Sequence, residues 1–421
     1  MKRLLLVAVI ILGLQSVSFG QRQTELIVTV RDGQAIAEIN KDNQTTTLKS
    51  ISGTNTYLIA PNADANVTLR KLLKEPRLQS VETNSRFQLA DSAETVFLLD
   101  DNAETVFLLD KKTILNGVEV PELYVRQPAL SIVQAAAARN ISTGAATRVA
   151  TIDTGVDFNH PALKPWLDAG ADLVNGSSAS EYDGLALADS QETIFLLDNG
   201  GVKSAIPTAF GHGTLVAGTI HAVAPDATIV PIKAFNAYGR TTLFTIIEAV
   251  YRSIELKADV INMSFSTGDD SFALRTAVNK ARSLGITVVS SMGNGGKYTD
   301  SIYPAAFTGV FGVAATDFQD RVAGFSNYGK VAAISAPGTF VITTAPGGRY
   351  AAASGTSFSA PLVSGTVSLL ASLRNRGAAQ GTLVINSAES IDAKNPGFER
   401  MLGKGRLNAR LALQQLLLEQ K

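Results

Sequence analysis

The stretch from residue 228 to residue 292 decides the fold. It reads TIVPIKAF at 228–235, VINMSF at 260–265 and ITVVSSM at 286–292. Each run is short and almost continuously apolar, as strands buried on both faces are. Between them, residues 243–254 and 274–284 carry apolar side chains at the spacing of one helical face. This alternation predicts an α/β fold: a doubly wound, mostly parallel sheet with helices on both faces.

Length and composition exclude several classes of protein. The chain has 421 residues, of which 45% are apolar and only 18% charged, so it can bury a large core. Its 37 basic and 37 acidic residues cancel, which argues against nucleic acid or an anionic membrane as the main partner. Cysteine is absent, which excludes disulfides, thiolate metal sites and a cysteine nucleophile. Histidine chemistry must use His160, His212 or His221.

The first twenty residues have the layout of an export signal. Lys2 and Arg3 precede an apolar run at 4–14, and the small residues Ser18 and Gly20 mark a cleavage position. A helix as long as this run rises only about 16 Å, whereas the hydrocarbon core of a bilayer is about 30 Å thick. We therefore predict a signal peptide at 1–20, a secreted or periplasmic protein, and no membrane span after signal removal.

Four segments follow the signal. Residues 21–90 mix short strand patterns with a helical pattern at 66–73, which predicts a small α+β domain. No helical pattern is evident between Asp32 and Lys41. Residues 91–121 form a repeat-bearing linker, residues 122–415 carry the alternating strands and helices, and residues 416–421 are a short tail.

A ten-residue repeat occurs three times: DSAETVFLLD at 91–100, DNAETVFLLD at 101–110 and DSQETIFLLD at 189–198. Each copy is a β-prone apolar run between carboxylates, and the copies are too scattered for a solenoid. Two interpretations stay open. The copies are a duplicated surface insertion without function, or they pair as added edge strands. Unchanged folding and activity after deletion of 189–198 would argue against the second.

Three polar residues stand at glycine-flanked junctions between strands and helices, where ligands of parallel sheets bind. Asp153 ends an apolar strand pattern, His212 lies in a Gly-His-Gly-Thr sequence, and Ser357 ends a Ser-Gly-Thr-Ser sequence. A serine hydroxyl becomes a nucleophile when a neutral imidazole takes its proton and a carboxylate holds that imidazole in one tautomer. Asn294, at the end of another strand pattern, is available as a donor to an oxyanion.

These motifs resemble those of the subtilisin-like serine proteases. The resemblance rests on VATIDTGVDFNHP at 149–161, GHGTLVAG at 211–218 and SGTSFSAP at 354–361, and it extends from Glu122 to Leu413. The order Asp, His, Ser along the chain is also that of the family. The resemblance implies a serine endopeptidase that works through an acyl-enzyme intermediate, with a catalytic triad of Asp153, His212 and Ser357.

The resemblance implies further roles. Asn294 would be the side-chain oxyanion donor, and two stretches would flank the first substrate pocket and pair with the substrate backbone: Ser264, Phe265 and Ser266, and Ser291, Met292 and Gly293. The segment after the signal would be a propeptide, acting as intramolecular inhibitor and chaperone of a self-processing proenzyme. The mature enzyme would be a monomer acting on polypeptides.

The same resemblance implies no required cofactor. A structural calcium ion is a family expectation, and Asp269 and Asp270 are available carboxylates. This sequence departs from the family pattern at Leu215, at Phe358 and at Met292, and the bulk of Met292 is expected to narrow the substrate cleft.

Other classes fit less well. An α/β-hydrolase esterase needs Gly-x-Ser-x-Gly and the order Ser, Asp, His, and a zinc metalloprotease needs His-Glu-x-x-His; this sequence has neither pattern around Ser357 or its histidines. The remaining alternative is a protease-like fold kept as a non-enzymatic binding protein, which a fluorophosphonate probe distinguishes. His160 and His221 are interpreted as packing or surface residues.

Overall fold

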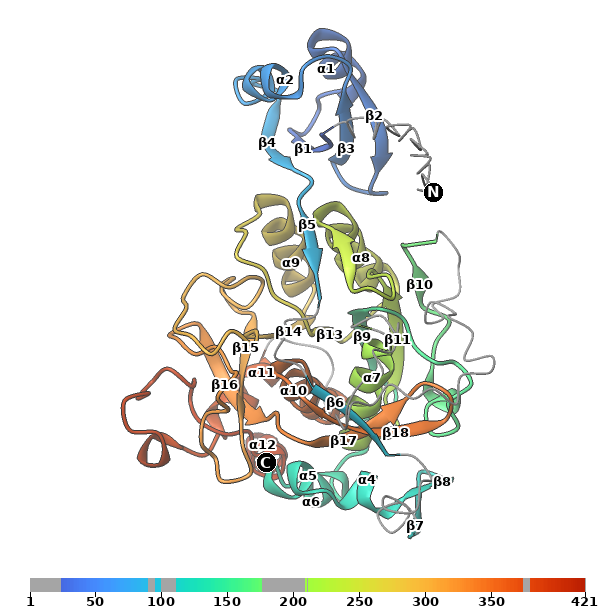
Figure 1. Ribbon diagram of the computed structural model, residues 1–421, viewed down its shortest axis with the longest axis vertical. Coiled ribbons are helices and arrows are strands. Elements are labelled where there is room, and N and C mark those ends of the chain that lie inside the picture. Colours follow the sequence, from blue (N-terminus) through green and yellow to red (C-terminus); the bar gives the residue numbers. More distant parts are fainter. Residues whose placement is uncertain are drawn as a thin grey trace, which may run out of the picture. The chain divides into compact units, whose positions relative to one another are not determined.

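The computed structural model describes residues 24–89, 95–99, 111–175, 209, 211–373 and 379–420 (Figure 1). The chain divides into two compact units: residues up to 50 with 55–83, and residues 51–54 with 84 onward. The predicted signal peptide lies outside the described residues. Residues 84–89, predicted as the end of the propeptide-like domain, belong to the larger unit. No helix in the described ranges is both long and apolar enough to cross a bilayer.

The smaller unit is an α+β domain, as the sequence predicts. Its antiparallel sheet has the order β2 (Thr45–Ser50), β3 (Thr56–Pro61), β1 (Leu26–Val30) and β4 (Leu78–Thr83). Helix α2 (Ala65–Leu72) begins at Asp64, whose side chain accepts the Val67 N–H (2.9 Å). Apolar side chains from the strands and helices form one buried cluster: Leu26, Val28, Val30, Ile39, Ile59, Leu72 and Leu78.

Helix α1 (Ile36–Asn43) corrects the sequence analysis, which found no helical pattern between Asp32 and Lys41. Only Ile39 and Asn43 of this helix are buried, and the Asn43 side chain donates to the Ile39 carbonyl (2.9 Å). A single buried apolar residue in two turns is too few to make a periodic pattern. Tertiary packing therefore reveals a helix that the sequence pattern does not.

The larger unit is built on a seven-stranded parallel sheet, which confirms the predicted fold class (Figure 1). Its first long strand, β9 (Arg148–Asp153), lies between β11 and β13, so the strand order reverses there. Open α/β sheets bind ligands beyond the carboxyl ends of the strands at such a reversal. In sheet order the other strands are β10 (Ala171–Asp172), β11 (Thr228–Lys233), β13 (Val260–Met263), β14 (Thr287–Ser291), β15 (Phe311–Thr316) and β16 (Ala332–Pro337).

Helices cover this sheet in two pairs. Helices α8 (Leu243–Glu255) and α9 (Phe272–Ser283) pack on each other and on β9, β11 and β14, whereas α7 (His212–Val223) and α10 (Thr356–Ala371) pack on each other and on strands β9 and β13–β16. Helix α10 is buried on all sides, as its apolar and small residues predict. The remaining helices and hairpin are β7 (Lys112–Leu115), β8 (Val118–Pro121), α4 (Glu122–Arg126), α5 (Pro128–Ile132), α6 (Ala135–Arg139), α11 (Ala379–Asn386) and α12 (Ala409–Glu419).

Two strands from the region before residue 100 join small sheets of the larger unit. Strand β5 (Arg86–Gln88) pairs antiparallel with β12 (Arg240–Thr242). Strand β6 (Thr95–Leu99) pairs antiparallel with β18 (Arg349–Ser354), whose other neighbour is β17 (Val341–Ala345). Because β6 is the apolar part of the first repeat copy, the second of the two open interpretations, an added edge strand, holds for that copy. The second and third copies lie outside the described residues.

Candidate active site

The polar residues that the sequence singles out lie at one edge of the parallel sheet. Asp153 is the last residue of β9, Ser264 directly follows β13, and Asn294 comes three residues after β14. Since these strands are consecutive neighbours in the sheet, their carboxyl ends meet at the same edge. Two helices begin here, α7 with His212 as its first residue and α10 with Ser357 as its second.

Asp153 and His212 form a buried pair. The His212 Nδ1 atom lies 2.8 Å from Oδ1 and 2.9 Å from Oδ2 of Asp153. The carboxylate accepts this hydrogen bond and so favours the tautomer with its proton on Nδ1. Both side chains are almost fully buried, and exclusion of water strengthens a hydrogen bond to a charged group.

The backbones after these two residues are also tied together. The Gly213 N–H donates to the Thr154 hydroxyl (3.0 Å). A Cβ at Gly213 would lie 2.0 Å from the Gly155 carbonyl oxygen, so only glycine permits this close approach. Gly213 therefore allows the start of α7 to lie close to the chain that follows β9.

Ser357 is held at the start of α10 by Ser264. The Ser264 hydroxyl donates to the Ser357 carbonyl (2.9 Å), and the Ser357 hydroxyl donates to the Ser264 carbonyl (3.1 Å). The ring of the next residue, Phe358, lies 5.7 Å from the His212 ring, centroid to centroid. Ser357 thus belongs to the same edge as the Asp153–His212 pair, with its N–H in a first helical turn, where the helix dipole is positive.

Asn294 has a fixed orientation beside Ser357. Its Oδ1 atom accepts hydrogen bonds from the backbone N–H and from the hydroxyl of Thr356, both at 2.8 Å. Because Thr356 holds the carbonyl end of this amide, the NH2 end points away from Thr356.

Asn327 supports the loop that carries Asn294. Its Nδ2 donates to the Met292 carbonyl (2.8 Å), and its Oδ1 accepts the Gly295 N–H (3.1 Å). Neither Asn327 nor Thr356 is predicted from the sequence to be part of the site. The one sequence signal for Thr356 is that it directly precedes Ser357.

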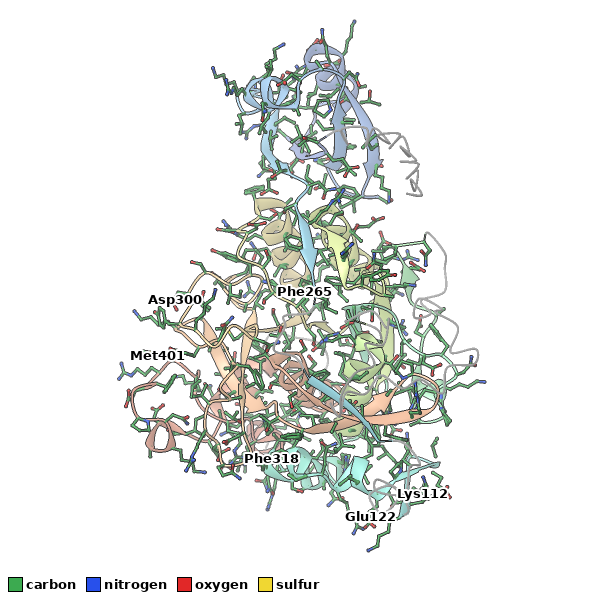
Figure 2. The ribbon with its side chains drawn as sticks, viewed as in Figure 1. Lys112, Glu122, Phe265, Asp300, Phe318 and Met401 are labelled. Carbon is green, nitrogen blue, oxygen red and sulfur yellow. The ribbon has the colours of Figure 1, made fainter. Side chains whose placement is uncertain are left out.

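The residues predicted to meet the substrate form two adjacent stretches, 264–266 and 291–293. A Cβ built at Gly293 would lie 2.6 Å from the Ser266 hydroxyl, so the stretches approach closely. The Phe265 ring packs against the Phe235 ring, with 5.2 Å between the ring centroids. Figure 2 shows where Phe265 lies in the larger unit. The Ser264 and Ser291 side chains are buried, which leaves their backbones as the groups able to pair with a peptide.

Met292 corrects an expectation. Its side chain is fully buried in a cluster with Ala305, Ala314, Ala332, Ile391 and Leu402, so it does not narrow an exposed cleft. The residue follows directly on β14, and successive residues of an extended chain point to opposite faces. Met292 takes the face that packs into this cluster.

The other two histidines are packing residues rather than surface residues. His160 is fully buried, and its Nε2 atom lies 2.9 Å from the Arg349 carbonyl oxygen. His221 is also fully buried, with its ring stacked 6.3 Å from the ring of Trp166. Burial lowers the pKa of His160, and it lowers the pKa of His221 to about 3, with repulsion from His160 and Arg139 adding to the effect.

The buried His221 predicts a stability that falls in mild acid. The ordinary pKa of histidine is 6.5, and the pKa of His221 in the folded chain is about 3. At pH values between these two, His221 is protonated in the unfolded chain and neutral in the folded chain. The contribution of His221 to the unfolding free energy is therefore complete well above pH 6.5 and decreases as the pH falls. At pH 5 the loss from this residue is about 2 kcal/mol. We expect His221→Leu to reduce the drop in unfolding free energy between pH 7 and pH 5, measured by urea titration of a Ser357→Ala background. An unchanged drop would contradict this.

The expected structural calcium ion stays a prediction. Within the described ranges, no three acidic or histidine side chains converge as ligands of one ion would. Of the two carboxylates available from the sequence, Asp270 forms an ion pair with Arg275, and Asp269 stands on the exposed loop beside it. No step of the chemistry below uses a metal.

Curated proteins resemble this chain at the level of sequence. The chain matches the Subtilase family (Peptidase_S8) over residues 144–405. Thermitase from Thermoactinomyces vulgaris is 31% identical over 304 residues, which are 70% of this chain and 98% of thermitase. Subtilisin BL from Lederbergia lenta is 33% identical over 293 residues, 67% of this chain and 97% of its own. An intracellular serine protease from Paenibacillus polymyxa is 35% identical over 58% of this chain and 73% of its own.

Solved structures share the fold. Fervidolysin from Fervidobacterium pennivorans, a keratinolytic enzyme related to subtilisin, superimposes with a TM-score of 0.71 at 23% identity, over 93% of this chain but only 61% of fervidolysin. A lanthipeptide protease superimposes with a TM-score of 0.59 at 26% identity, over 70% of this chain and 97% of its own. Since the family match covers more than half of the 421 residues, the chain belongs to the subtilase family and is a serine endopeptidase.

Proposed function

We propose that this subtilase is a secreted or periplasmic endopeptidase that hydrolyses polypeptides with an Asp153–His212–Ser357 triad and is made as a self-processing proenzyme. The observation that carries the triad is the buried hydrogen bond from His212 Nδ1 to Asp153, at the edge where Ser357 starts α10. The signal layout at 1–20 supports export. The mature enzyme acts as a monomer and needs no cofactor.

The triad divides the work in a defined order. Ser357 Oγ attacks the carbonyl carbon of the scissile peptide while His212 Nε2 takes the hydroxyl proton. The C–N bond then breaks, and the imidazolium gives that proton to the departing amine, which leaves an acyl-enzyme. Water attacks the acyl carbon, gives a proton to His212 and releases the new carboxylate, and Ser357 regains its proton. Asp153 keeps the imidazole in the reactive tautomer and stabilises the imidazolium.

Two donors stabilise the negative charge that develops on the substrate oxygen. One is the Ser357 N–H at the start of α10, where the helix dipole favours an anion. The other is the Asn294 NH2 group, whose direction follows from the hydrogen bonds of Thr356 to Asn294 Oδ1. Since these donors are fixed before the reaction, they need no reorganisation when the charge appears.

Replacing Asn294 with leucine tests the second donor. We expect kcat to fall by about 10²–10³-fold with KM nearly unchanged, because the hydrogen bond exists only when the oxyanion forms; that magnitude is the one known for subtilisin itself. Steady-state kinetics on a peptide substrate measure both constants, and the melting temperature reports the loss of the Thr356 bonds separately. A fall in folding yield equal to the fall in rate would make Asn294 structural.

A fluorophosphonate probe separates this proposal from a non-enzymatic protease-like fold. The probe labels only an activated serine, so we expect labelling of the mature protein that Ser357→Ala abolishes. Ser359 offers a matched control, since it lies in the same helix and its hydroxyl donates to the Pro337 carbonyl (3.1 Å). Labelling should persist in Ser359→Ala. Absence of labelling in the folded wild type would reject the enzyme.

Self-processing predicts that the wild type and Ser357→Ala have different N-termini. In the wild type, the α+β domain serves as inhibitor and chaperone of the larger unit until Ser357 cuts the chain between about Ala90 and Glu122. In Ser357→Ala the nucleophile is missing, so the precursor should stay uncut. N-terminal sequencing of both proteins after expression measures this, and mature wild-type enzyme added to the variant tests cutting in trans. Normal processing of Ser357→Ala in a protease-deficient host would contradict it.

A further inference from the structure

We propose that the outer edge of β18 is a binding site for the residues that follow the peptide bond to be cut. In the precursor, β6 occupies this docking edge, defined as the backbone of Arg349–Ser354 on the side away from β17. With β6 held there, Ser357 would cut one of the peptide bonds between Leu89 and Thr95. This inference rests on the proposed self-processing, and it adds a binding site and a position for the cut.

The chain before the proposed cut is anchored beside His212. Strand β5 pairs with β12, and the Leu89 N–H donates to the Gly239 carbonyl (2.7 Å). A Cβ built at Gly239 would lie 2.9 Å from Leu89 Cβ and 2.8 Å from Ala209 Cβ. The Ala209 carbonyl in turn accepts the His212 N–H (3.2 Å). Leu89 and Ala209 therefore lie against the same glycine, and Ala209 is hydrogen-bonded to the first residue of α7, His212.

The chain after the proposed cut is anchored beside Ser357. In the antiparallel ladder, Thr95 lies opposite Ser354, and the pairing continues to Leu99 opposite Tyr350. Strand β18 runs directly into α10, so Ser354 precedes Ser357 by three residues, a distance of at most about 11 Å. Figure 1 shows β6 lying along β18 in this arrangement.

The two anchors restrict the position of the cut. Leu89 and Thr95 are joined by six residue steps, which span at most about 20–22 Å when fully extended. One end is fixed on the His212 side of the edge and the other on the Ser357 side. Holding a substrate at both ends makes the reaction intramolecular and removes most of its orientational freedom. Hydrolysis of the bond consumes one water and leaves the new amino terminus paired to β18 through β6.

The docking edge suits main-chain recognition. Residues 351–353 of β18 are all alanine, so on neither face of the sheet does a bulky β18 side chain limit which residues the added strand carries there. Strand addition of this kind takes its affinity from backbone hydrogen bonds and tolerates change in the added sequence. The repeat supplies such strands, since the five residues TVFLL at 95–99 recur unchanged at 105–109.

Paired proline substitutions test the docking edge in the full-length precursor. Alternate N–H groups of an antiparallel strand bond to its neighbour, so prolines at two adjacent positions remove at least one ladder bond. We expect Val96→Pro/Phe97→Pro to slow self-processing at least tenfold. The matched control is Val106→Pro/Phe107→Pro in the second copy, which should process at the wild-type rate. Equal rates for the two variants would overturn the proposal.

Deletion of residues 91–100 gives a second, independent test. It moves the second copy into the place of the first, so the precursor should still process near the wild-type rate. Its new amino terminus should be Ala90 or one of the residues from Asp101 to Thr105. Loss of processing in this deletion would contradict backbone docking. The mature enzymes from the second-copy proline variant and from the deletion should hydrolyse an unrelated peptide with kcat/KM within twofold of the wild type.

Hydrogen exchange keeps the test apart from catalysis. In a Ser357→Ala background, the amides of residues 350–354 should exchange faster in the first-copy proline variant and remain protected in the second-copy variant. Equal protection would mean that β6 does not occupy the edge. A wild type that neither processes itself nor cleaves any peptide would reject the proposed function, while the exchange result would still decide the pairing.

Discussion

Replacing Ser357 with alanine should lower kcat for peptide hydrolysis by about a million-fold, the size of the loss known for subtilisin itself. The neighbouring Ser264 is not expected to replace it as nucleophile, because Ser264 is buried and its hydroxyl donates to the Ser357 carbonyl (2.9 Å). The activity that remains should still exceed the uncatalysed reaction by about 10³–10⁴-fold, since substrate binding and the oxyanion donors persist. Active-site-titrated rates on a chromogenic peptide measure this loss.

The Ser357→Ala measurement needs a folded reference. Ser359→Ala removes a hydroxyl from the same helix without touching the proposed triad, and we expect its kcat to stay within a few-fold of the wild type. Similar losses in both variants would indicate damage to α10 rather than loss of a nucleophile. An active Ser357→Ala enzyme would refute the proposed mechanism outright.

Replacing Asp153 with asparagine should lower kcat by about 10⁴-fold, a magnitude seen in other serine proteases. The amide preserves the shape of the side chain, but its NH2 group favours the wrong tautomer of His212, with the proton on Nε2 instead of Nδ1. The imidazole then cannot accept the Ser357 proton, and no charge stabilises the imidazolium. Because the loss lies in proton transfer, KM should change little.

Asp157 provides the matched control for Asp153. It is also buried after β9, but its oxygens accept the Asn159 N–H (2.9 Å) and the Gly347 N–H (2.8 Å) and none of the predicted triad residues. We expect Asp157→Asn to lower the melting temperature and to leave kcat within about tenfold of the wild type. Higher pH should partly restore Asp153→Asn through hydroxide-assisted attack, whereas a structural defect would not respond in this way.

Much of the architecture could be predicted from the sequence, because strands buried on both faces carry a continuous apolar pattern and helices between them carry a periodic one. The runs at 228–235 and 260–265 contain strands β11 and β13. The pattern fails where few side chains are buried, as in α1 with only Ile39 and Asn43. The sequence pattern also left open whether the repeat is an inert insertion or an added edge strand, because a β-prone segment does not specify which strand it pairs with.

The sequence by itself indicated which residues are candidates for the proposed chemistry. Asp153 ends a strand, Asn294 follows another, and His212 and Ser357 begin helices, at positions that local patterns reveal. Only the tertiary structure decided their surroundings: Thr356 holding Asn294, Asn327 supporting its loop, Met292 turned into the core, and the first repeat copy paired with β18. The physical reason is the separation along the chain over which each effect acts. Pattern and propensity act over a few residues, whereas these contacts join residues from 13 to 259 positions apart, and packing alone selects them.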